Sequence, residues 1–301
     1  MDSSPLLFTA PVPADAPRVH ELAQSALGSD AAFANIYLLQ EKYGTTIAFA
    51  GGYFFRHFSG NGRLSGYAFP CGVGGDIRTA LEQIRRDAAT RGNTLRFCLL
   101  TAEQKNTLEA LYPGEFAFST DRGDADYLYT RDQLAELPGP PFHSKRNHIA
   151  QFVRQHPDWQ LSPLAEHNTQ DALSVAHGWL RGLPEASPAL QHEARAIEKA
   201  LQHRESLQLF GGVLYVAGKA VAMSIGSFIS PGVADIHYEK CLPDWKKAYP
   251  LINREMAAHL QGCRLINREE DLNQEGLRKA KLSYHPAILL EKFSATPLPP
   301  C

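Results

Sequence analysis

The sequence predicts a mixed α/β protein with two similar halves, each built on a mixed β-sheet flanked by helices. Three observations lead to this prediction. Short aromatic and β-branched runs alternate with stretches of helical period, a pattern typical of mixed α/β folds. The same order of elements occurs twice along the chain. The chain has 301 residues, which is more than one hydrophobic core usually contains and fits two domains.

The first half is expected to open with a strand and two helices, and to continue with three antiparallel strands, a helix, a strand, a helix and a closing strand. The middle helix is the clearest, because Ile77, Leu81 and Ile84 recur at helical spacing. Thr101 with Gln104 predicts a capping box for the next helix. The expected ranges are, in order, 6–9, 15–27, 30–42, 45–50, 53–58, 64–70, 77–91, 95–100, 101–112 and 127–129.

The second half follows the same plan. The run Pro-Gly-Pro-Pro-Phe at 138–142 is a linker signal that separates it from the first half. We therefore expect an N-terminal domain over 1–138, a basic linker helix over 139–157 and a C-terminal domain over 158–301. The expected elements of this last domain are, in order, 159–164, 169–180, 188–204, 207–216, 220–229, 234–241, 244–260, 264–266, 275–284 and 287–293.

Composition limits the class of protein. A net charge of −2 argues against a wholly basic nucleic-acid binder. The five cysteines form no Cys-x-x-Cys pair, which favours reduced thiols. The chain has no apolar run of about 18 residues and no leader pattern at its start, so we expect no membrane span. The sequence thus predicts a cytoplasmic protein.

The element order of each half is that of the GCN5-related N-acetyltransferase fold, an analogy at the level of the fold. In that fold, the pyrophosphate of an acyl-thioester cofactor lies where the strand after the hairpin enters the long helix. Here that junction contains Lys246, Lys247 and Tyr249, and cations at a helix start make sense if an anion binds there. A plain helix start is the alternative. The first-half junction at 70–76 is rich in glycine, which lets a backbone approach a phosphate.

The third strand of the second half offers groups for proton transfer. By alternation, Asp235, His237 and Glu239 share one face, and Ile236 and Tyr238 share the other. Three titratable groups on one face of a central strand are costly unless they line a cavity. Glu239 or His237 is therefore the predicted general base of an acyl transfer. A solvated face at a sheet edge is the alternative.

The linker helix is basic. Its residues Lys145, Arg146 and Arg154 could hold the phosphates of a cofactor, a transfer RNA or a lipid head group. His143 and His148 are five positions apart, which is wrong for two metal ligands on one helix face, so we predict no metal. A connecting helix with a solvated face is the alternative.

The stretch from Arg264 to Pro286 packs many charges into a short space. Its polar turn at 267–271 follows a strand, which is where α/β proteins place binding groups. The alternative is a polar turn followed by a solvated basic helix. The cations that would hold phosphates or a carboxylate are Arg278, Lys279 and Lys281. The residues that would shape the acceptor site are Arg268, Glu269, Glu270 and Tyr284.

Three motifs carry a resemblance to a known family. They are FHSKRNHIAQFVRQHP at 142–157, HYEKCLPDWKKAYPLIN at 237–253 and INREEDLNQEGLRKAKLSYHP at 266–286. Together they resemble the bacterial DUF2156 family, which is similar to the C-terminal domain of phosphatidylglycerol lysyltransferases. The resemblance covers nearly the whole chain. It implies a tandem GCN5-related N-acetyltransferase fold, akin to the Fem-type transferases that use aminoacyl-transfer RNA.

One motif of the lysyltransferases, Gly-Leu-x-x-aromatic-Lys-x-Lys-aromatic-x-Pro, matches in part. Ala280 stands where an aromatic residue is usual, and Ser283 stands where a second lysine is usual. The resemblance therefore implies a related donor or acceptor rather than phosphatidylglycerol itself. The positions that match are Gly276, Leu277, Lys281, Tyr284 and Pro286.

These observations predict an acyltransferase that moves an aminoacyl or acyl group onto an amine or hydroxyl. The implied donor is an aminoacyl-transfer RNA or an acyl-coenzyme A, and the acceptor is a small molecule or a lipid head group. Two alternatives stay open: an acetyl-coenzyme A-dependent N-acetyltransferase, and a non-catalytic module that binds RNA or anionic lipid. We expect Lys281→Ala to reduce turnover strongly while leaving the melting temperature nearly unchanged.

Overall fold

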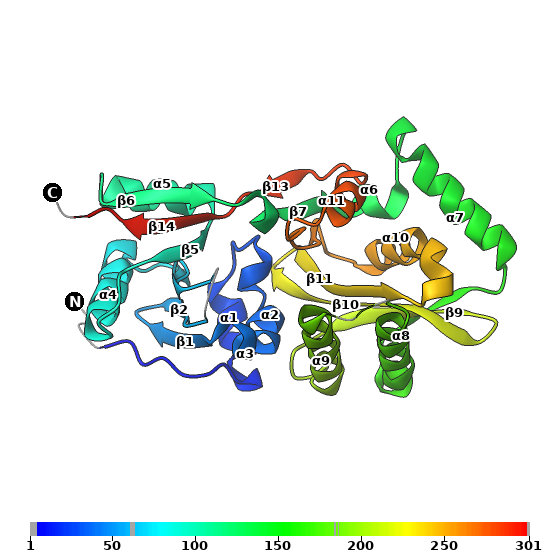
Figure 1. Cartoon of the computed structure of the whole chain (residues 1–301), viewed down its shortest axis with the longest axis horizontal. Coiled ribbons are helices and arrows are strands. Elements are labelled where there is room, and N and C mark those ends of the chain that lie inside the picture. Colours follow the sequence, from blue (N-terminus) through cyan, green and yellow to red (C-terminus); the bar gives the residue numbers. More distant parts are fainter. Residues whose placement is uncertain (1–4, 61–63, 184, 186, 300–301) are drawn as a thin grey trace. The chain divides into compact units, whose positions relative to one another are not determined.

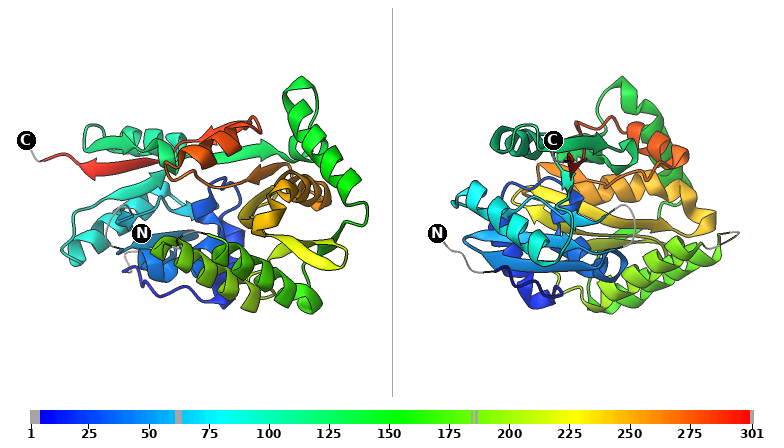
Figure 2. Two further views of the ribbon diagram at one scale, coloured as in Figure 1. Left: turned by 45° about the vertical axis from the view of Figure 1, so that its right-hand side comes forward. Right: turned by 60° about the vertical axis from the view of Figure 1, so that its left-hand side comes forward.

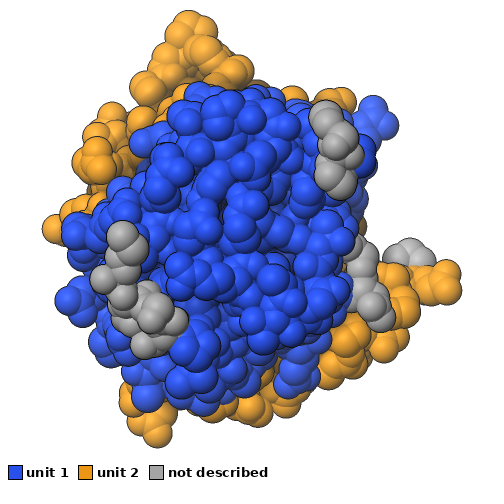
Figure 3. All heavy atoms as spheres, turned by 90° about the vertical axis from the view of Figure 1, so that its left-hand side faces the viewer, with its two compact units in different colours: residues 1–126, 270–278, 289–301 blue, residues 127–269, 279–288 orange. Residues whose placement is uncertain are grey.

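The computed structural model describes residues 5–60, 64–183, 185 and 187–299 (Figure 1). The chain forms two units, which Figure 3 shows in different colours. Unit 1 comprises Met1–Asp126, Glu270–Arg278 and Leu289–Cys301, and unit 2 comprises Tyr127–Glu269 and Lys279–Ile288. The continuous domain boundaries expected from the sequence stay a prediction.

Unit 1 contains a mixed sheet with the strand order β1-β2-β3-β5-β14-β6, and β4 pairs with β2. Strands β3 and β5 are parallel, whereas β2 pairs antiparallel with β1, β3 and β4, and β14 pairs antiparallel with β5 and β6. The strands are β1 (Thr45–Ala50), β2 (Tyr53–Phe58), β3 (Gly66–Tyr67), β4 (Cys71–Gly72), β5 (Phe97–Leu100), β6 (Phe116–Thr120) and β14 (Phe293–Pro297).

Two helices of unit 1 begin at recognisable capping residues. The Asp76 side chain accepts hydrogen bonds from the first-turn N–H groups of the long helix, and Thr101 with Gln104 forms the predicted capping box. The apolar stripe of the long helix, including Leu81 and Ile84, packs against aromatic side chains of the sheet such as Phe55. The helices and 3-10 turns are η1 (Pro13–Asp15), α1 (Ala16–Leu22), η2 (Ser29–Ala31), α2 (Phe33–Leu38), α3 (Gln40–Tyr43), α4 (Ile77–Thr90), α5 (Ala102–Leu111) and η3 (Arg122–Asp124).

Unit 2 contains a second mixed sheet with the strand order β13-β7-β12-β11-β10-β9-β8. Strands β11 and β12 are parallel, whereas β8 to β11 form an antiparallel meander. The strands are β7 (Asp126–Thr130), β8 (Gln160–Pro163), β9 (Phe210–Val216), β10 (Lys219–Ser230), β11 (Val233–Cys241), β12 (Leu265–Asn267) and β13 (Ile288–Leu290).

Helices cover both faces of the unit 2 sheet. Figures 1 and 2 show α8 and α9 on one face of the meander and α10 on the other. The α10 side chains Ile252 and Met256 pack against Ile236 of β11 in the core. The helices and turns are α6 (Arg131–Glu136), η4 (Pro140–Phe142), α7 (His143–Gln155), η5 (Glu166–Asn168), α8 (Thr169–Arg181), α9 (Pro188–Gln202), η6 (Pro243–Ala248), α10 (Tyr249–His259) and α11 (Glu275–Leu282), the last of which carries residues of both units.

The structure corrects two expectations about the elements. Strand β7 was expected to close the first half, but it pairs with β12 in the unit 2 sheet, while β14 from the far end of the sequence fills the unit 1 sheet. The expected helix over 244–260 is a 3-10 turn followed by α10, because Pro250 has no N–H to donate to the carbonyl of Lys246. Among the described residues, no helix is long and apolar enough to cross a bilayer.

Candidate functional site

A β-bulge in β11 positions the titratable side chains of this strand. Tyr238 pairs with Ile225 and Ile236 pairs with Gly226, so His237 is an extra residue on β11. An extra residue shifts the alternation of side chains by one position and bends the strand. Bulges are frequent next to active sites, where they redirect a side chain.

The bulge places Glu239 on a different face of the sheet from Asp235 and His237. Lys240 points toward the α8 and α9 face, where its Nζ donates to Glu193 of α9 at 2.7 Å. Glu239 therefore points toward the α10 face, on the same side as Ile236. The expectation that Asp235, His237 and Glu239 share one face is wrong, because simple alternation does not continue through a bulge.

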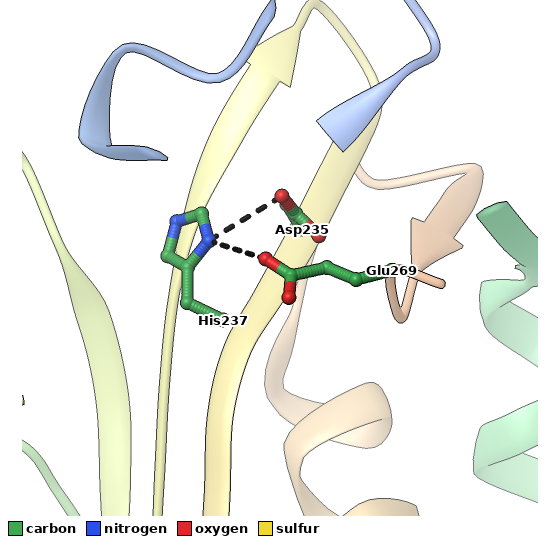
Figure 4. A group of neighbouring side chains, drawn as sticks. All are labelled: Asp235, His237 and Glu269. Atoms are coloured by element: carbon green, nitrogen blue, oxygen red, sulfur yellow. Dashed lines mark hydrogen bonds and ion pairs between the residues drawn. The ribbon is translucent and has the colours of Figure 1, made fainter. Parts of the chain in front are cut away.

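His237 is buried and lies between two carboxylates (Figure 4). Its Nδ1 is 3.3 Å from Oδ2 of Asp235 and 3.3 Å from Oε1 of Glu269, and its Nε2 is 2.8 Å from the Ser227 hydroxyl. Burial alone would lower the pKa of His237, but the two carboxylates outweigh burial and raise it to about 9. The imidazole is therefore protonated at neutral pH and serves as a hydrogen-bond donor.

The turn after β12 brings Glu269 to His237. Glu269 has a backbone φ of 57°, a left-handed conformation, and its N–H donates to the Asn267 side chain at 2.7 Å. Asn267 is fully buried at the end of β12, beside Asp235 of β11 in the parallel register. A polar turn that follows a parallel strand thus brings Glu269 to His237, and the binding role that the sequence predicts for this turn stays a prediction.

The same three side chains are a possible metal ligand set. Within the described residues, the donor atoms of Asp235, His237 and Glu269 lie within 4.8 Å of one another. A histidine binds a metal only in its neutral form, so an ion held by these three side chains would displace the proton that Asp235 and Glu269 stabilise on His237. The absence of a metal, expected from the histidine spacing on the linker helix, stays a prediction.

Glu239 forms a second group with Arg268. Arg268 Nη2 donates to Oε1 of Glu239 at 2.9 Å, and Asn253 of α10 lies beside both. With the Asn253 amide oxygen turned toward Arg268, it accepts from Nη1 at 3.1 Å and from Nε at 3.3 Å. Oε2 of Glu239 is buried and has no hydrogen-bond partner in the described part of the chain. Burial raises the pKa of Glu239, and the charge of Arg268, a hydrogen bond with the Asn253 side chain and the charge of Lys240 only partly offset this.

Two further residues extend this group around Arg268. The Tyr284 ring lies between cations, with the Arg268 guanidinium 5.4 Å and the Lys145 Nζ 4.1 Å from its centroid. Burial and the nearby Arg268 lower the pKa of Lys145. Four of the predicted site residues, from β11, the turn after β12, α7 and the segment after α11, therefore meet in unit 2.

Three of the predicted cations have structural partners. Lys281 is 8% exposed, and its Nζ donates to the backbone carbonyls of Arg268 at 2.5 Å and Glu269 at 3.0 Å. Arg146 donates to the carbonyls of Leu137 and Gly139, before α7. In unit 1, Arg278 makes a two-point contact with Asp271 at 2.8 and 2.9 Å. These contacts support the local chain and leave ligand binding by these cations a prediction.

The remaining predicted residues lie outside these two groups. Lys246, Lys247 and Lys279 are exposed. The Tyr249 hydroxyl accepts a hydrogen bond from the Cys241 backbone N–H at 3.3 Å. Glu270 lies in unit 1, where its charge helps to raise the pKa of the buried Lys292.

Sequence reasoning missed Asn253 and Ser227. Asn253 is a polar residue on the otherwise apolar stripe of α10, four positions after Tyr249, and that contrast is a detectable signal. Ser227 lies on β10 opposite Asp235, and nothing in its sequence context distinguishes it from other strand serines.

Comparison with known proteins decides the family. The family model described as "Phosphatidylglycerol lysyltransferase, C-terminal" matches residues 23–296 of the chain. The chain belongs to this family. The resemblance found in the sequence motifs is thereby confirmed, and the description of the family points to aminoacyl transfer.

Related structures cover nearly the whole chain. A conserved protein of unknown function from Bacteroides thetaiotaomicron is 33% identical and superposes with a TM-score of 0.92, over 97% of this chain and 100% of that one. The DUF2156 domain of a putative lysylphosphatidylglycerol synthetase from Agrobacterium fabrum is 16% identical, with a TM-score of 0.67 over 94% and 92%. The predicted tandem GCN5-related N-acetyltransferase-like fold is confirmed.

One curated relative matches at the level of sequence. It is an uncharacterized protein of Mycoplasmoides gallisepticum, 24% identical over 173 residues. The match covers 56% of this chain and 54% of that protein, so this chain spans about half the length of the curated relative.

Proposed function

We propose that unit 2 transfers an aminoacyl group from an activated ester, such as an aminoacyl-transfer RNA, to a hydroxyl or amine acceptor, with Glu239 as the proton acceptor. The single observation that carries this proposal is the state of Glu239. It is a buried carboxylate with a raised pKa, and one of its oxygens has no hydrogen-bond partner among the described residues. Such a group is suited to general base catalysis near neutral pH.

The proposed reaction is one acyl substitution. The acceptor oxygen or nitrogen attacks the ester carbonyl carbon, and its proton passes to Oε2 of Glu239. The new carbon–oxygen or carbon–nitrogen bond forms, the bond to the donor hydroxyl breaks, and Glu239 returns the proton to the leaving oxygen. The Arg268 guanidinium, 2.9 Å from Oε1 of Glu239, stabilises negative charge on the carbonyl oxygen.

The protonation states favour Glu239 over His237 as the base. His237 has a pKa of about 9, so its imidazole already carries the proton that a base must accept. In the proposed reaction His237 is a positioning residue. It holds Glu269, and its contact with Ser227 fixes the ring at the bulge.

Glu269 supports an aminoacyl substrate over an acetyl substrate. An aminoacyl group carries an ammonium that an acetyl group lacks, and an ammonium needs a carboxylate partner. The Glu269 side chain is 27% exposed, whereas its neighbour Asp235 is fully buried. Glu269 is therefore the carboxylate of this pair that a bound ammonium can reach. The adjacent residue Arg268 contacts Glu239 and thereby connects the His237 group to the proposed base.

The helix junction gives no comparable support for coenzyme A. A pyrophosphate would need free N–H groups at the start of α10. Pro250 stands in the first turn of α10 and contributes no N–H, and Lys246 and Lys247 precede it on exposed positions of η6. Aminoacyl transfer from an ester donor is thus the function that the geometry supports best.

The test is a transfer assay with the full chain. A pool of radiolabelled aminoacyl-transfer RNA is mixed with phosphatidylglycerol vesicles, glycerol phosphate or a simple amine, and the labelled product is separated and counted. Glu239→Gln should reduce transfer by about 10²–10⁴-fold, the usual contribution of a general base. The matched control is Glu205→Gln, because the Glu205 side chain is 82% exposed and its carboxylate pairs with the neighbouring Arg204.

Three outcomes would contradict the proposal. Transfer by Glu239→Gln at the wild-type rate would remove this residue from the chemistry. Transfer of acetyl from acetyl-coenzyme A, with no aminoacyl transfer, would favour the N-acetyltransferase alternative. Binding of RNA or anionic vesicles that weakens steeply with salt, without transfer, would favour the binding module.

A further inference from the structure

Unit 1 contains a cavity of about 500 Å³ that none of the predicted site residues lines. A cavity of this size lies within the usual range for small-molecule sites, about 300–1,000 Å³. Its walls come from the segment at 22–31, strands β2, β4 and β5, and the first turns of α4 and α5. Part of the glycine-rich junction identified in the sequence, Pro70 to Gly72, lies in its wall.

One wall residue, Arg56 of β2, has an unused hydrogen-bond donor. Arg56 is 4% exposed, and its Nη1 donates to the Asp30 carboxylate at 2.8 Å and to the Asp30 carbonyl. Its Nε is buried and makes no hydrogen bond within the described residues, and the Cys71 thiol beside the guanidinium is only a weak acceptor. A buried guanidinium N–H without an acceptor is costly, and such groups in native proteins call for a partner.

The charges beside the cavity already balance. Lys292 Nζ lies 2.7 Å from Oδ1 of Asp126 and 3.4 Å from Oδ1 of Asp30, and Arg56 pairs with Asp30. Two buried cations thus face the buried Asp126 and the partly exposed Asp30, and the exposed Glu103 adds a further negative charge to the lining. Burial raises the pKa of Asp30, but Lys292 and Arg56 outweigh burial and lower it. A ligand anion would add an uncompensated charge to this group, whereas a neutral carbonyl oxygen would accept from Arg56 Nε without one.

The rest of the wall is of mixed character, with polar side chains such as Thr101 and Gln104 beside several aliphatic and aromatic ones. One of these residues, Leu99 of β5, has a φ of 60°, which is strained for a leucine, and strained backbone clusters at ligand-binding and active sites. A hydrocarbon chain is the group that the apolar part of such a wall binds. The apolar wall residues are Leu22, Leu27, Phe69, Ile77, Leu99 and Leu290.

We infer that this unit 1 cavity binds an uncharged amphipathic molecule whose ester or amide carbonyl accepts a hydrogen bond from Arg56 Nε and whose alkyl chain lies along the apolar wall. The inference is independent of the chemistry proposed for unit 2. It rests on the cavity, on the unused donor and on the balance of buried charge.

The test is a calorimetric titration of the full chain with four probes. Octanamide and methyl octanoate carry the neutral carbonyl and distinguish an amide from an ester, octanoate carries a charge, and acetamide lacks the chain. Octanamide or methyl octanoate should bind saturably, octanoate should bind more weakly, and acetamide should show no measurable binding.

Two variants test the hydrogen bond from Arg56 Nε and the volume of the cavity. Arg56→Lys keeps a cation beside Asp30 but removes Nε, and it should weaken binding of the neutral probes by about tenfold, the usual loss for a hydrogen bond to a charged group. Ala102→Trp fills the cavity from an exposed lining position and should abolish binding. Its matched control is Ala110→Trp, which lies on the same helix, is exposed and does not line the cavity.

Further results would decide whether the inference holds. If Arg56→Lys fails to fold, the comparison of Ala102→Trp with Ala110→Trp decides the question. Equal binding by those two variants, or no saturable binding of either neutral probe to the wild type, would overturn the inference. Tighter binding of octanoate than of octanamide would overturn the assignment of an uncharged ligand.

Discussion

Glu239 and His237 are close in sequence on β11, yet different neighbouring groups determine the pKa of each side chain. Burial raises the pKa of Glu239, and Arg268, Asn253 and Lys240 only partly oppose this. His237 is buried as well, but two carboxylates raise its pKa to about 9. At neutral pH the histidine therefore holds a proton, while the glutamate is the group that can exchange one during a reaction.

At the scale of single residues, the pH dependence of transfer should report the ionisation of Glu239. Since the base must be ionised, kcat/KM should rise with pH through its raised pKa. Arg268→Gln removes one of the cations that lower this pKa, so the acidic limb should move to higher pH. The measurement is kcat/KM from about pH 5 to about pH 9. Identical limbs in the two proteins would exclude Glu239 as the titrating group.

His237 should make the protein less stable as the pH rises into the alkaline range, whereas an ordinary carboxylate loses its contribution to stability at acidic pH. Its pKa is raised from 6.5 to about 9 on folding, so its contribution is fully present below about pH 6.5 and is lost as the pH rises through about 9. The loss should be roughly 3 kcal/mol at most in the free energy of unfolding.

Urea unfolding of the wild type and of His237→Gln, at a series of pH values, measures this contribution. The difference between the two curves isolates His237 from the other groups that titrate in the same range. A difference that stays constant from about pH 6 to about pH 10 would show that the imidazole carries no extra proton in the folded state.

At the scale of elements, the bulge in β11 decides which groups can act together. The sequence predicted the strand, because the pattern of apolar and polar residues is strong. It did not predict the bulge, since no Gly or Pro marks His237 and the register depends on the pairing with β10. Residues 267–271 were predicted as a functional turn from their position after a strand, and Glu269 reaches the site from there.

Lys281 belongs to this scale, because its contacts join α11 to the turn after β12. Its Nζ binds the carbonyls of Arg268 and Glu269, so we now expect Lys281→Met to lower the free energy of unfolding by about 2 kcal/mol. Lys279→Met, at an exposed position of the same helix, is the control. Chemical denaturation measures both, and equal stability of the two variants would restore the earlier expectation that Lys281 affects turnover alone.

At the scale of the whole molecule, the sequence predicted the repeated element order but not the exchange of strands. Strand β7 lies in the unit 2 sheet, and β14 lies in the unit 1 sheet between β5 and β6. Short strands such as β6 and β14 carry little periodicity, and their partners are far away in the sequence. Local patterns therefore could not assign them to a sheet.

Removal of β14 should disrupt unit 1. A chain that ends at residue 292 lacks the strand that pairs with both β5 and β6, so amides of those strands should lose protection in hydrogen exchange. A chain that ends at Pro299 keeps β14 and serves as the control. Unchanged protection of β5 and β6 in the shorter chain would mean that the remaining contacts suffice to hold the sheet.

The position of β14 also imposes an order on biosynthesis. Strand β6, the last strand of its sheet, pairs with β14, whose residues 293–297 are translated long after those of β6. At ordinary ribosome speeds the delay is roughly 10–30 seconds. Throughout that interval the backbone N–H and C=O groups of β5 and β6 that later pair with β14 are unpaired. Strands of other chains can pair with these edges, which promotes aggregation. Co-expression of a chaperone that shields such edges should therefore raise the yield of native protein, and the truncated chain should depend on it permanently.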